Sequence, residues 1–350
     1  MQSQRVIHIK SKFYKFTLCL AVIDFILLLF INSQNSIEGI KEGLTLCAAT
    51  LIPSLFPFMV AANFISYSGI GITLAKPIGK ICHFLFKIPK QYSYIILLSF
   101  IGGYPVGASL VNDLCKQKAI DKKTATRLIC FCVNAGPAMI VFTVGKCIYN
   151  SIVLGFILWG CHILASMIIG AVLGFFSKGT IKNDYVLCKS IGCVDSLVLA
   201  IENASKSLII ICSFVVFFSC VINLCYTKIG TISLLLEVTT ACKEIMENKL
   251  SIYFTAFILG FSGLSVIFQV YSISGKSVNF IALIISRIAH GVLSVIFLRL
   301  YMLITNQTVA VISNGVNTKP VTFVYSLPFT LSLIGVAITF LIFTSDKSKN

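Results

Sequence analysis

The chain has 350 residues, of which 57% are hydrophobic and 11% are charged, and its mean hydropathy is +0.96. In soluble globular domains about a quarter of all residues are charged. This composition therefore excludes a soluble protein and indicates an all-α polytopic membrane protein. The net charge of +16 does not indicate a nucleic-acid partner, because the lysines lie mostly in loops between apolar segments, where membrane topology accounts for them.

Apolar segments of helical length follow one another along the chain. The first, residues 16–31, comes after four basic residues and is expected to stay in the protein, because the polar stretch behind it offers no small-residue cleavage site. Segments 70–86 and 229–242 give the weakest indication of a membrane helix. In chain order, the predicted helices cover residues 16–31, 43–66, 70–86, 92–114, 127–147, 150–176, 200–225, 229–242, 251–274, 279–304 and 321–344.

The cysteines and histidines do not form a recognisable site in the sequence. Most of the fourteen cysteines lie inside apolar segments, where a free cysteine acts as a small hydrophobic residue, and no C-x-x-C pair occurs. The four histidines, His8, His83, His162 and His290, are scattered, and no catalytic triad, phosphate loop or HExxH pattern is present. We therefore expect no enzymatic activity, no cofactor and no bound metal.

The segment 92–114 contains three glycines and a proline at its centre, in Phe100-Ile-Gly-Gly-Tyr-Pro-Val-Gly-Ala-Ser109. These residues interrupt a helix, and broken backbone at membrane depth is tolerated only where it is buried in protein or lines a wet cavity. We therefore predict a re-entrant hairpin or broken helix with Gly102–Gly107 at its tip. The candidate substrate-binding residues here are Gly102, Gly103, Tyr104, Pro105 and Ser109.

An ungapped shift of 160 residues aligns Gly103 with Gly263 and Arg127 with Arg287, at equivalent places relative to the apolar segments. Two related halves are typical of transporters. The predicted organisation is a basic tail with the first helix over 1–39, a first repeat over 40–176, a basic cytoplasmic linker over 177–199, a second repeat over 200–345 and a C-terminal tail over 346–350.

The distribution of charge predicts that the two halves are inverted. Residues 67–126 contain eight lysines and two aspartates, whereas the equivalent residues 227–286 contain four lysines and three glutamates. Because lysine-rich loops stay in the cytoplasm, the first stretch is expected to be cytoplasmic and the second to face the other side. If 92–114 and 251–274 are re-entrant, each half crosses the membrane three times. This count leaves one conflict, since it puts Lys347 and Lys349 outside.

The second half has a counterpart of the glycine-rich stretch in Gly260-Phe-Ser-Gly-Leu-Ser-Val-Ile-Phe-Gln269. Small residues also serve close packing between membrane helices, which is the alternative interpretation of both stretches. Their correspondence across the repeat favours a substrate site. The candidate residues here are Ser262, Gly263, Ser265 and Gln269.

A third interruption is expected at Asn134-Ala-Gly-Pro-Ala138. Pro137 removes a backbone donor and frees the carbonyl near Val133, while Asn134 offers an amide beside the break. Such a break exposes backbone dipoles that bind ions or carboxylates, although a simple proline kink is the alternative. Asn134, Gly136 and Pro137 are the candidate residues.

Glu237 is an acidic residue within an apolar stretch, and Thr239 follows it closely. An ionisable group at membrane depth marks an ion or proton path, whereas at the interface it would merely be solvated. Arg127 and Arg287 begin corresponding helices and are candidates for pairing with an anion. The alternative for each arginine is an anchor that extends to the membrane surface.

With these residues in view, the chain resembles the nucleoside-recognition (Gate) domain membrane proteins and, within them, the YlbJ (SpoVV) family of sporulation integral membrane proteins. It departs from the family's pattern at Ala241 and Ile267, which weakens the second-half site. The matching stretches are Pro53-Ser-Leu-Phe-Pro-Phe58, Gly102-Gly-Tyr-Pro-Val-Gly-Ala108, Phe131-Cys-Val-Asn-Ala-Gly-Pro137, Leu235-Leu-Glu-Val-Thr239 and Gly263-Leu-Ser-Val266.

This resemblance implies a role in endospore formation, a place in the forespore envelope, in the outer forespore membrane, and dipicolinate as cargo. It also implies a distant likeness to concentrative nucleoside transporters, with their inverted repeats and re-entrant hairpins. We therefore expect a transporter of a small organic anion that works by alternating access. A transporter of a nucleoside or a metal ion and a non-transporting membrane scaffold are the alternatives. The expected partners are the anion and the lipid bilayer, and a homo-oligomer is left open.

Overall fold

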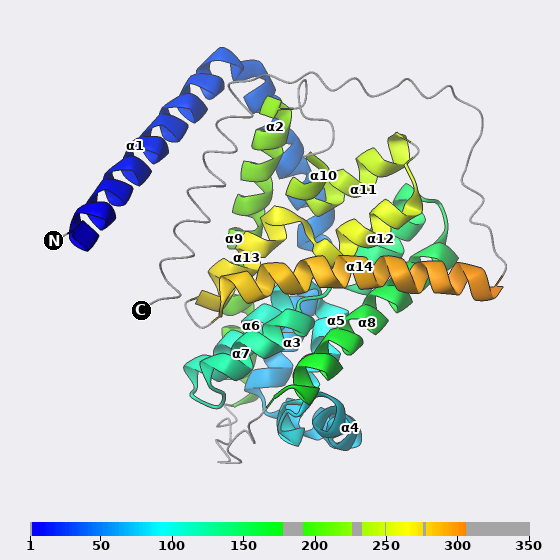
Figure 1. Ribbon diagram of the computed structural model, residues 1–350. Helices are drawn as coiled ribbons and strands as arrows, with labels where there is room; N and C mark the ends of the chain where they lie inside the picture. Colours follow the sequence, from blue (N-terminus) through cyan, green and yellow to red (C-terminus); the bar gives the residue numbers. More distant parts are fainter. Residues whose placement is uncertain (1, 178–191, 226–232, 249, 276–277, 306–350) are drawn as a thin grey trace.

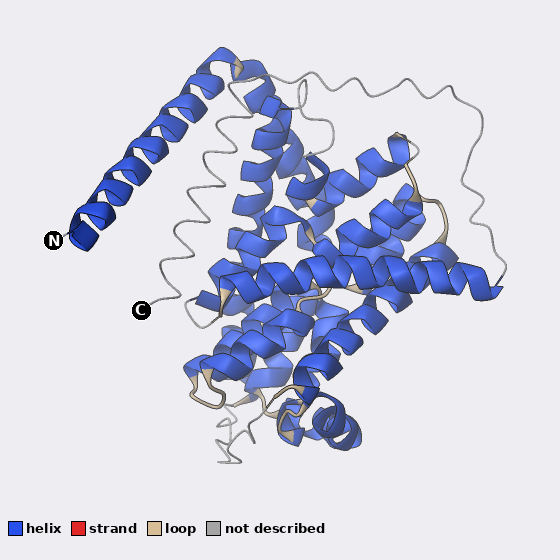
Figure 2. Ribbon diagram, in the orientation of Figure 1, coloured by secondary structure: helices blue, strands red, loops and turns tan. Residues whose placement is uncertain are grey.

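The computed structural model describes residues 2–177, 192–225, 233–248, 250–275 and 278–305. Within these ranges every regular element is a helix, as Figure 2 shows, and the chain is an all-α polytopic membrane protein. The predicted helix 321–344 and the tail 346–350 lie outside the described residues. Five described segments are long and apolar enough to cross a membrane: Ser33–Tyr67, Ile152–Phe175, Cys193–Leu224, Ile252–Ser274 and Phe280–Thr305.

The first elements are α1 (Gln2–Ile31), α2 (Ser33–Leu46), the π-helix η1 (Cys47–Leu51) and α3 (Ile52–Tyr67), and α1 projects from the body of the protein (Figure 1). The second predicted helix was expected to begin only at residue 43. The polar residues 33–42 are also helical, because α2 packs on α9 (Cys193–Cys225). The hydroxyl of Ser36 lies 3.2 Å from the sulfur of Cys220 in this contact. Tertiary contact outweighs the weak local helix signal.

The glycine-rich stretch is broken at Gly103, whose φ of 84° and ψ of 179° are accessible essentially to glycine alone. A Cβ atom built on Gly107 would lie 3.1 Å from that of Ser99, whereas residues eight apart in a straight helix are about 12 Å apart. The segment therefore folds back as a helical hairpin, with a tighter tip than predicted. Its elements are α4 (Ile70–Phe86), η2 (Lys90–Tyr92), α5 (Tyr94–Gly102) and α6 (Tyr104–Lys116).

The predicted helix 127–147 is divided into α7 (Lys122–Cys132) and the π-helix η3 (Ala138–Ile148), followed by α8 (Ile152–Phe175). Asp121 caps α7 by accepting the N–H of Thr124 at 2.9 Å. Hydrogen bonds from the side chain and the backbone of Thr124 lower the pKa of Asp121. Residues 133–136 between α7 and η3 are not helical, as the Asn-Ala-Gly-Pro sequence predicts.

The second half contains a break at Ser262 and Gly263, which have φ values of 70° and 75°. Gly103 and Gly263, which the shift of 160 residues aligns, thus both have positive φ at a helix break. However, α12 and α13 splay apart instead of folding back as α5 and α6 do (Figure 1), so the second hairpin expected from the sequence is a broken helix. The elements after α9 are α10 (Ser233–Leu236), α11 (Val238–Glu247), α12 (Ile252–Phe261), α13 (Gly263–Ser274) and α14 (Phe280–Thr305).

Elements of the two halves pack together across the protein. The long helix α9 packs along α2 and α3, and α14 lies across α8 and α12 (Figure 1). Helix α9 begins at Cys193, inside the stretch predicted as a linker over 177–199. Because α14 and α8 enclose the break between α7 and η3, residues of the second half form part of the surroundings of a first-half break.

The inverted repeat stays a prediction, and side-specific labelling tests it. In a background without the fourteen native cysteines, we expect a membrane-impermeant maleimide to label Lys118→Cys only from the cytoplasmic side. Lys276→Cys, which lies outside the described residues, is expected to react only from the opposite side. Labelling of both positions from one side would indicate parallel halves.

Candidate functional site

A cavity lies where the interruptions of several helices meet. Its lining surrounds about 550 Å³ of space that includes open solvent, of which only about 30 Å³ admits the centre of a water molecule, and apolar side chains make up most of its wall. Three hydroxyl residues that sequence reasoning missed, Thr50, Ser54 and Thr143, also line it. The predicted site residues in the wall are Gly103, Tyr104, Pro105, Gly136, Glu237, Thr239 and Gln269.

The remaining predicted residues do not line this cavity. Ser109 is buried within α6, and Gly102 and Gly263 lie at the breaks themselves. Their role in binding stays a prediction. The predicted residues outside the lining are Gly102, Ser109, Asn134, Pro137, Ser262, Gly263, Ser265, Arg127 and Arg287.

The hairpin tip and the Asn-Ala-Gly-Pro break are in direct backbone contact. A Cβ atom built on Gly136 would lie 2.8 Å from the carbonyl oxygen of Ile101 and 3.0 Å from the nitrogen of Gly103. Real Cβ atoms essentially never approach another atom as closely as 2.8 Å, so only glycine fits at position 136 without a shift. The sequence predicted the two breaks separately, and the structure brings them together at the cavity.

Three helices point their N-termini at the cavity. Tyr104 and Pro105 belong to the first turn of α6, Met139 to the first turn of η3, and Val238 and Thr239 to the first turn of α11. A helix N-terminus carries a partial positive charge equivalent to about half an elementary charge. The N–H groups of Val106, Met139 and Thr240 at these termini donate to Gly103, Gly136 and Glu237. These backbone dipoles favour a carboxylate beside them, and the carboxylate of Glu237 already lies at the N-terminus of α11.

Glu237 lies in the wall between α10 and α11, and only 2% of its surface is exposed. Its carboxylate accepts the N–H of Thr240 at 2.7 Å and so caps the N-terminus of α11. Gly263 approaches the same break, since a Cβ atom built on it would lie 3.2 Å from the nitrogen of Val238. The acidic residue is therefore buried within the protein and is not a solvated residue at the interface.

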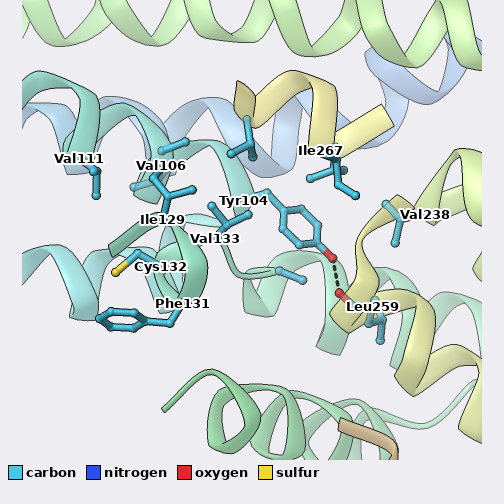
Figure 3. Packing of buried hydrophobic residues seen from close by; sticks show 14 of the residues in the cluster. Tyr104, Val106, Val111, Ile129, Phe131, Cys132, Val133, Val238, Leu259 and Ile267 are labelled. Carbon is cyan, nitrogen blue, oxygen red and sulfur yellow. Dashed lines mark hydrogen bonds between the residues drawn. The ribbon is translucent and has the colours of Figure 1, made fainter. Parts of the chain in front are cut away.

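Tyr104 connects the two halves across the cavity wall. Its hydroxyl donates to the carbonyl oxygen of Leu259 at 2.7 Å, near the end of α12, as Figure 3 shows. The ring is buried beside Val238 and Ile267 (Figure 3). The sequence predicts substrate contact for Tyr104, and the structure adds a contact that holds the hairpin to the second break.

We expect Tyr104→Phe to lower the free energy of unfolding by about 1–3 kcal/mol, because the buried carbonyl of Leu259 loses its donor. Thermal unfolding in detergent measures the effect. Tyr271→Phe is the control, since the hydroxyl of Tyr271 makes no hydrogen bond within the described part of the chain. Equal stability of both variants would show that the Tyr104 hydroxyl does not join the halves.

Arg287 is fully buried, and its guanidinium binds the end of α7. One nitrogen donates to the carbonyl oxygen of Val133 and the other to that of Cys130 at 2.5 Å. The carbonyl of Val133 is the one that Pro137 leaves without its helical donor. Arg287 thus stabilises the break as a C-terminal cation, and the predicted pairing with an anion stays untested.

Arg127 belongs to α7 and does not line the cavity. Its guanidinium donates to the carbonyl oxygen of Lys87 at 2.9 Å, where α4 has just ended. This contact ties α7 to α4. It agrees with the anchoring alternative, and pairing of Arg127 with an anion stays a prediction.

Asn134 supports the break from inside the protein. Its amide nitrogen donates to the carbonyl oxygen of Phe131 at 2.8 Å, and Ser166 donates to the same oxygen at 2.5 Å. In the second half, Gln269 donates to the hydroxyl of Ser265 at 3.0 Å. The Ser262 hydroxyl donates to the neighbouring carbonyl of Phe261. These bonds satisfy backbone and side-chain groups around the two breaks.

The structure brings together two histidines that are scattered in the sequence. The rings of His162 on α8 and His290 on α14 are 4.2 Å apart between centroids, and both are buried. His162 Nε2 accepts the N–H of Ala135 at 3.0 Å, and His290 Nε2 donates to the carbonyl oxygen of His162 at 2.9 Å. The pair therefore links α14 through α8 to the break that supplies Gly136. No local sequence pattern indicates it.

The comparisons with known proteins agree with a membrane protein of sporulation. The chain is 23% identical over 318 residues to the sporulation integral membrane protein YlbJ of Bacillus subtilis (strain 168), with 77% of this chain and 78% of that protein covered. The chain is related to the YlbJ family. No family model and no solved structure matches. A Gate domain, suggested by the resemblance in sequence, stays a prediction.

Proposed function

We propose that the chain is a membrane transporter of a small organic anion and that its cargo is dipicolinate, carried into the developing forespore. It works by alternating access of the cavity between the two halves of the chain, in the outer forespore membrane. The observation that carries this proposal is the convergence of the N-termini of α6, η3 and α11 on one cavity. The name of its relative adds the link to sporulation.

The chemistry of the wall fits a flat aromatic dicarboxylate. The apolar side chains of Leu51, Leu55 and Val266 offer surface for a ring, and the partial positive charge of the helix N-termini favours carboxylate oxygens. The glycines at 103 and 136 allow the backbone to approach the cargo closely. The hydroxyls of Thr50 and Thr143 and the amide of Gln269 are the side-chain groups that would orient it.

A nucleoside is the second candidate, because the described lining contains hydroxyl and amide groups and no lysine, arginine or histidine. A neutral cargo would need no cationic partner. A stability screen on the purified chain separates the two. We expect dipicolinate, and not nucleosides, to raise the melting temperature. Stabilisation by nucleosides alone would overturn dipicolinate as cargo.

Uptake of labelled dipicolinate into vesicles that contain the purified chain tests transport itself. We expect Gln269→Leu to reduce uptake at least tenfold, because loss of one well-placed polar contact costs about 1.4 kcal/mol or more. Gln117→Leu, at an exposed position after α6, is the control and should transport like the unmodified chain. A chain that inserts and folds but transports nothing would favour the scaffold alternative.

A further inference from the structure

We infer that Glu237 is the proton-binding site that couples cargo to the pH gradient, so that one proton enters the cavity with each dianion. This inference rests on the proposed function of anion transport. The buried carboxylate of Glu237 lies in the wall of a site proposed to bind an anion, so two groups of the same charge would meet there.

The negative charges in the loaded cavity would exceed the positive ones. The three helix N-termini supply roughly half a positive charge each, whereas a dianion and an ionised Glu237 together supply three negative charges. The described wall contains no cationic side chain that could balance the difference. A proton on Glu237 removes one negative charge, and it also turns the carboxyl group into a donor for a carboxylate oxygen of the cargo.

Glu237 has hydrogen-bond donors in Thr239 and Thr240, but no described neighbour offers it a positive charge. The titratable groups that act on it electrostatically are Cys47 of η1, Tyr104 of α6 and Cys242 of α11, and none of these is a cation. Arg287, which acts on Tyr104, is bound to the carbonyls of Cys130 and Val133. The described residues of α9, α13 and η3 that line the cavity are not titratable.

The placement of Glu237 suits a site that gains and loses a proton. Its carboxylate caps α11 through the N–H of Thr240, and that N–H stabilises the ionised form. When cargo arrives from the aqueous side, a proton from the water binds the carboxylate. When the cavity faces the other side and cargo leaves, the proton returns to water and the carboxylate again caps α11. No other group has to change its charge in this cycle.

The experiment uses vesicles containing the full chain, with the membrane potential held at zero and labelled dipicolinate as the probe. A pH difference of one unit, acid outside, is expected to drive about tenfold accumulation, since one coupled proton contributes a factor of ten per unit. With Glu237→Gln, which keeps the shape of the protonated group, we expect exchange of external for internal dipicolinate without any pH dependence and without accumulation. Glu202→Gln, on the exposed face of α9, is the control and should accumulate cargo like the unmodified chain.

The outcomes separate the two levels of the proposal. If the unmodified chain neither takes up nor exchanges dipicolinate, the proposed function fails and the coupling fails with it. If it exchanges dipicolinate, but accumulation does not respond to pH or Glu237→Gln still accumulates it, only the role of Glu237 is overturned. Should Glu237→Gln not fold, Glu237→Asp replaces it. This variant should still accumulate cargo, but accumulation should be half-maximal at a different pH. If that pH is the same as for the unmodified chain, the inference is overturned.

Discussion

Replacing Arg287 by methionine is expected to lower the free energy of unfolding by about 3–5 kcal/mol, the usual effect of removing one member of a buried charged interaction. The carbonyls of Val133 and Cys130 would lose their donors at the end of α7, inside the protein. Methionine keeps much of the side-chain volume, so the change reports mainly on the lost polar contacts. Thermal unfolding of the purified chain in detergent measures it.

Two further variants make the experiment on Arg287 decisive. Arg299→Met, on the exposed face of the same helix, should unfold within a few tenths of a kcal/mol of the unmodified chain. Arg287→Lys should fall between the two, because one ammonium group cannot reproduce the planar fork of a guanidinium. If Arg287→Met is as stable as the unmodified chain but binds dipicolinate poorly, the anion pairing predicted from the sequence is correct and the structural role is wrong.

The contact of Arg287 shows how far the sequence could predict the site. Pro137 indicated that a carbonyl near Val133 would be free, because the absence of a proline N–H is a local property. The donor that satisfies this carbonyl lies 154 residues further along the chain. No spacing rule identifies such a partner, and the arginine was therefore assigned to the cargo. The repeat aligned Arg127 with Arg287, but the two side chains bind different helix ends.

The helix breaks were the most predictable features, because each depends on residues within a few positions. Glycine at 103 and 263 and proline at 137 mark the backbone where it departs from the helix. The way each break turns the chain was not predictable. A single glycine with extended ψ reverses direction at 103, whereas two left-handed residues at 262 and 263 leave α12 and α13 splayed.

The histidine pair was missed for the opposite reason. His162 and His290 lie on different helices 128 residues apart, and each looks like a single buried histidine in its own segment. Only the packing of α14 across α8 brings their rings together (Figure 1). The small residue Gly291 beside His290 does not indicate this partner, because it packs against Phe257 and Gly260 of α12.

The second prediction with a large effect concerns Gly107, which lies in α6 against the end of α7. A Cβ atom built on Gly107 would lie 1.8 Å from the carbonyl oxygen of Cys132, so alanine cannot fit unless the two helices separate. We expect Gly107→Ala to lower the free energy of unfolding by at least 1–3 kcal/mol, roughly the range for overpacked cores. We also expect it to abolish dipicolinate uptake, because the hairpin tip at Gly103 and the break at Gly136 would lose their contact.

Gly160 provides a matched control, since it lies within α8 and a Cβ atom built there meets nothing within 4 Å. Gly160→Ala should leave uptake unchanged and raise the free energy of unfolding by up to about 1 kcal/mol, because alanine has the higher helix propensity. Comparison of the two substitutions separates the close approach of helices from the general effect of removing a glycine. If Gly107→Ala unfolds and transports like Gly160→Ala, the hairpin does not pack on the broken helix as described, and the cavity between them would have to be assigned to other residues.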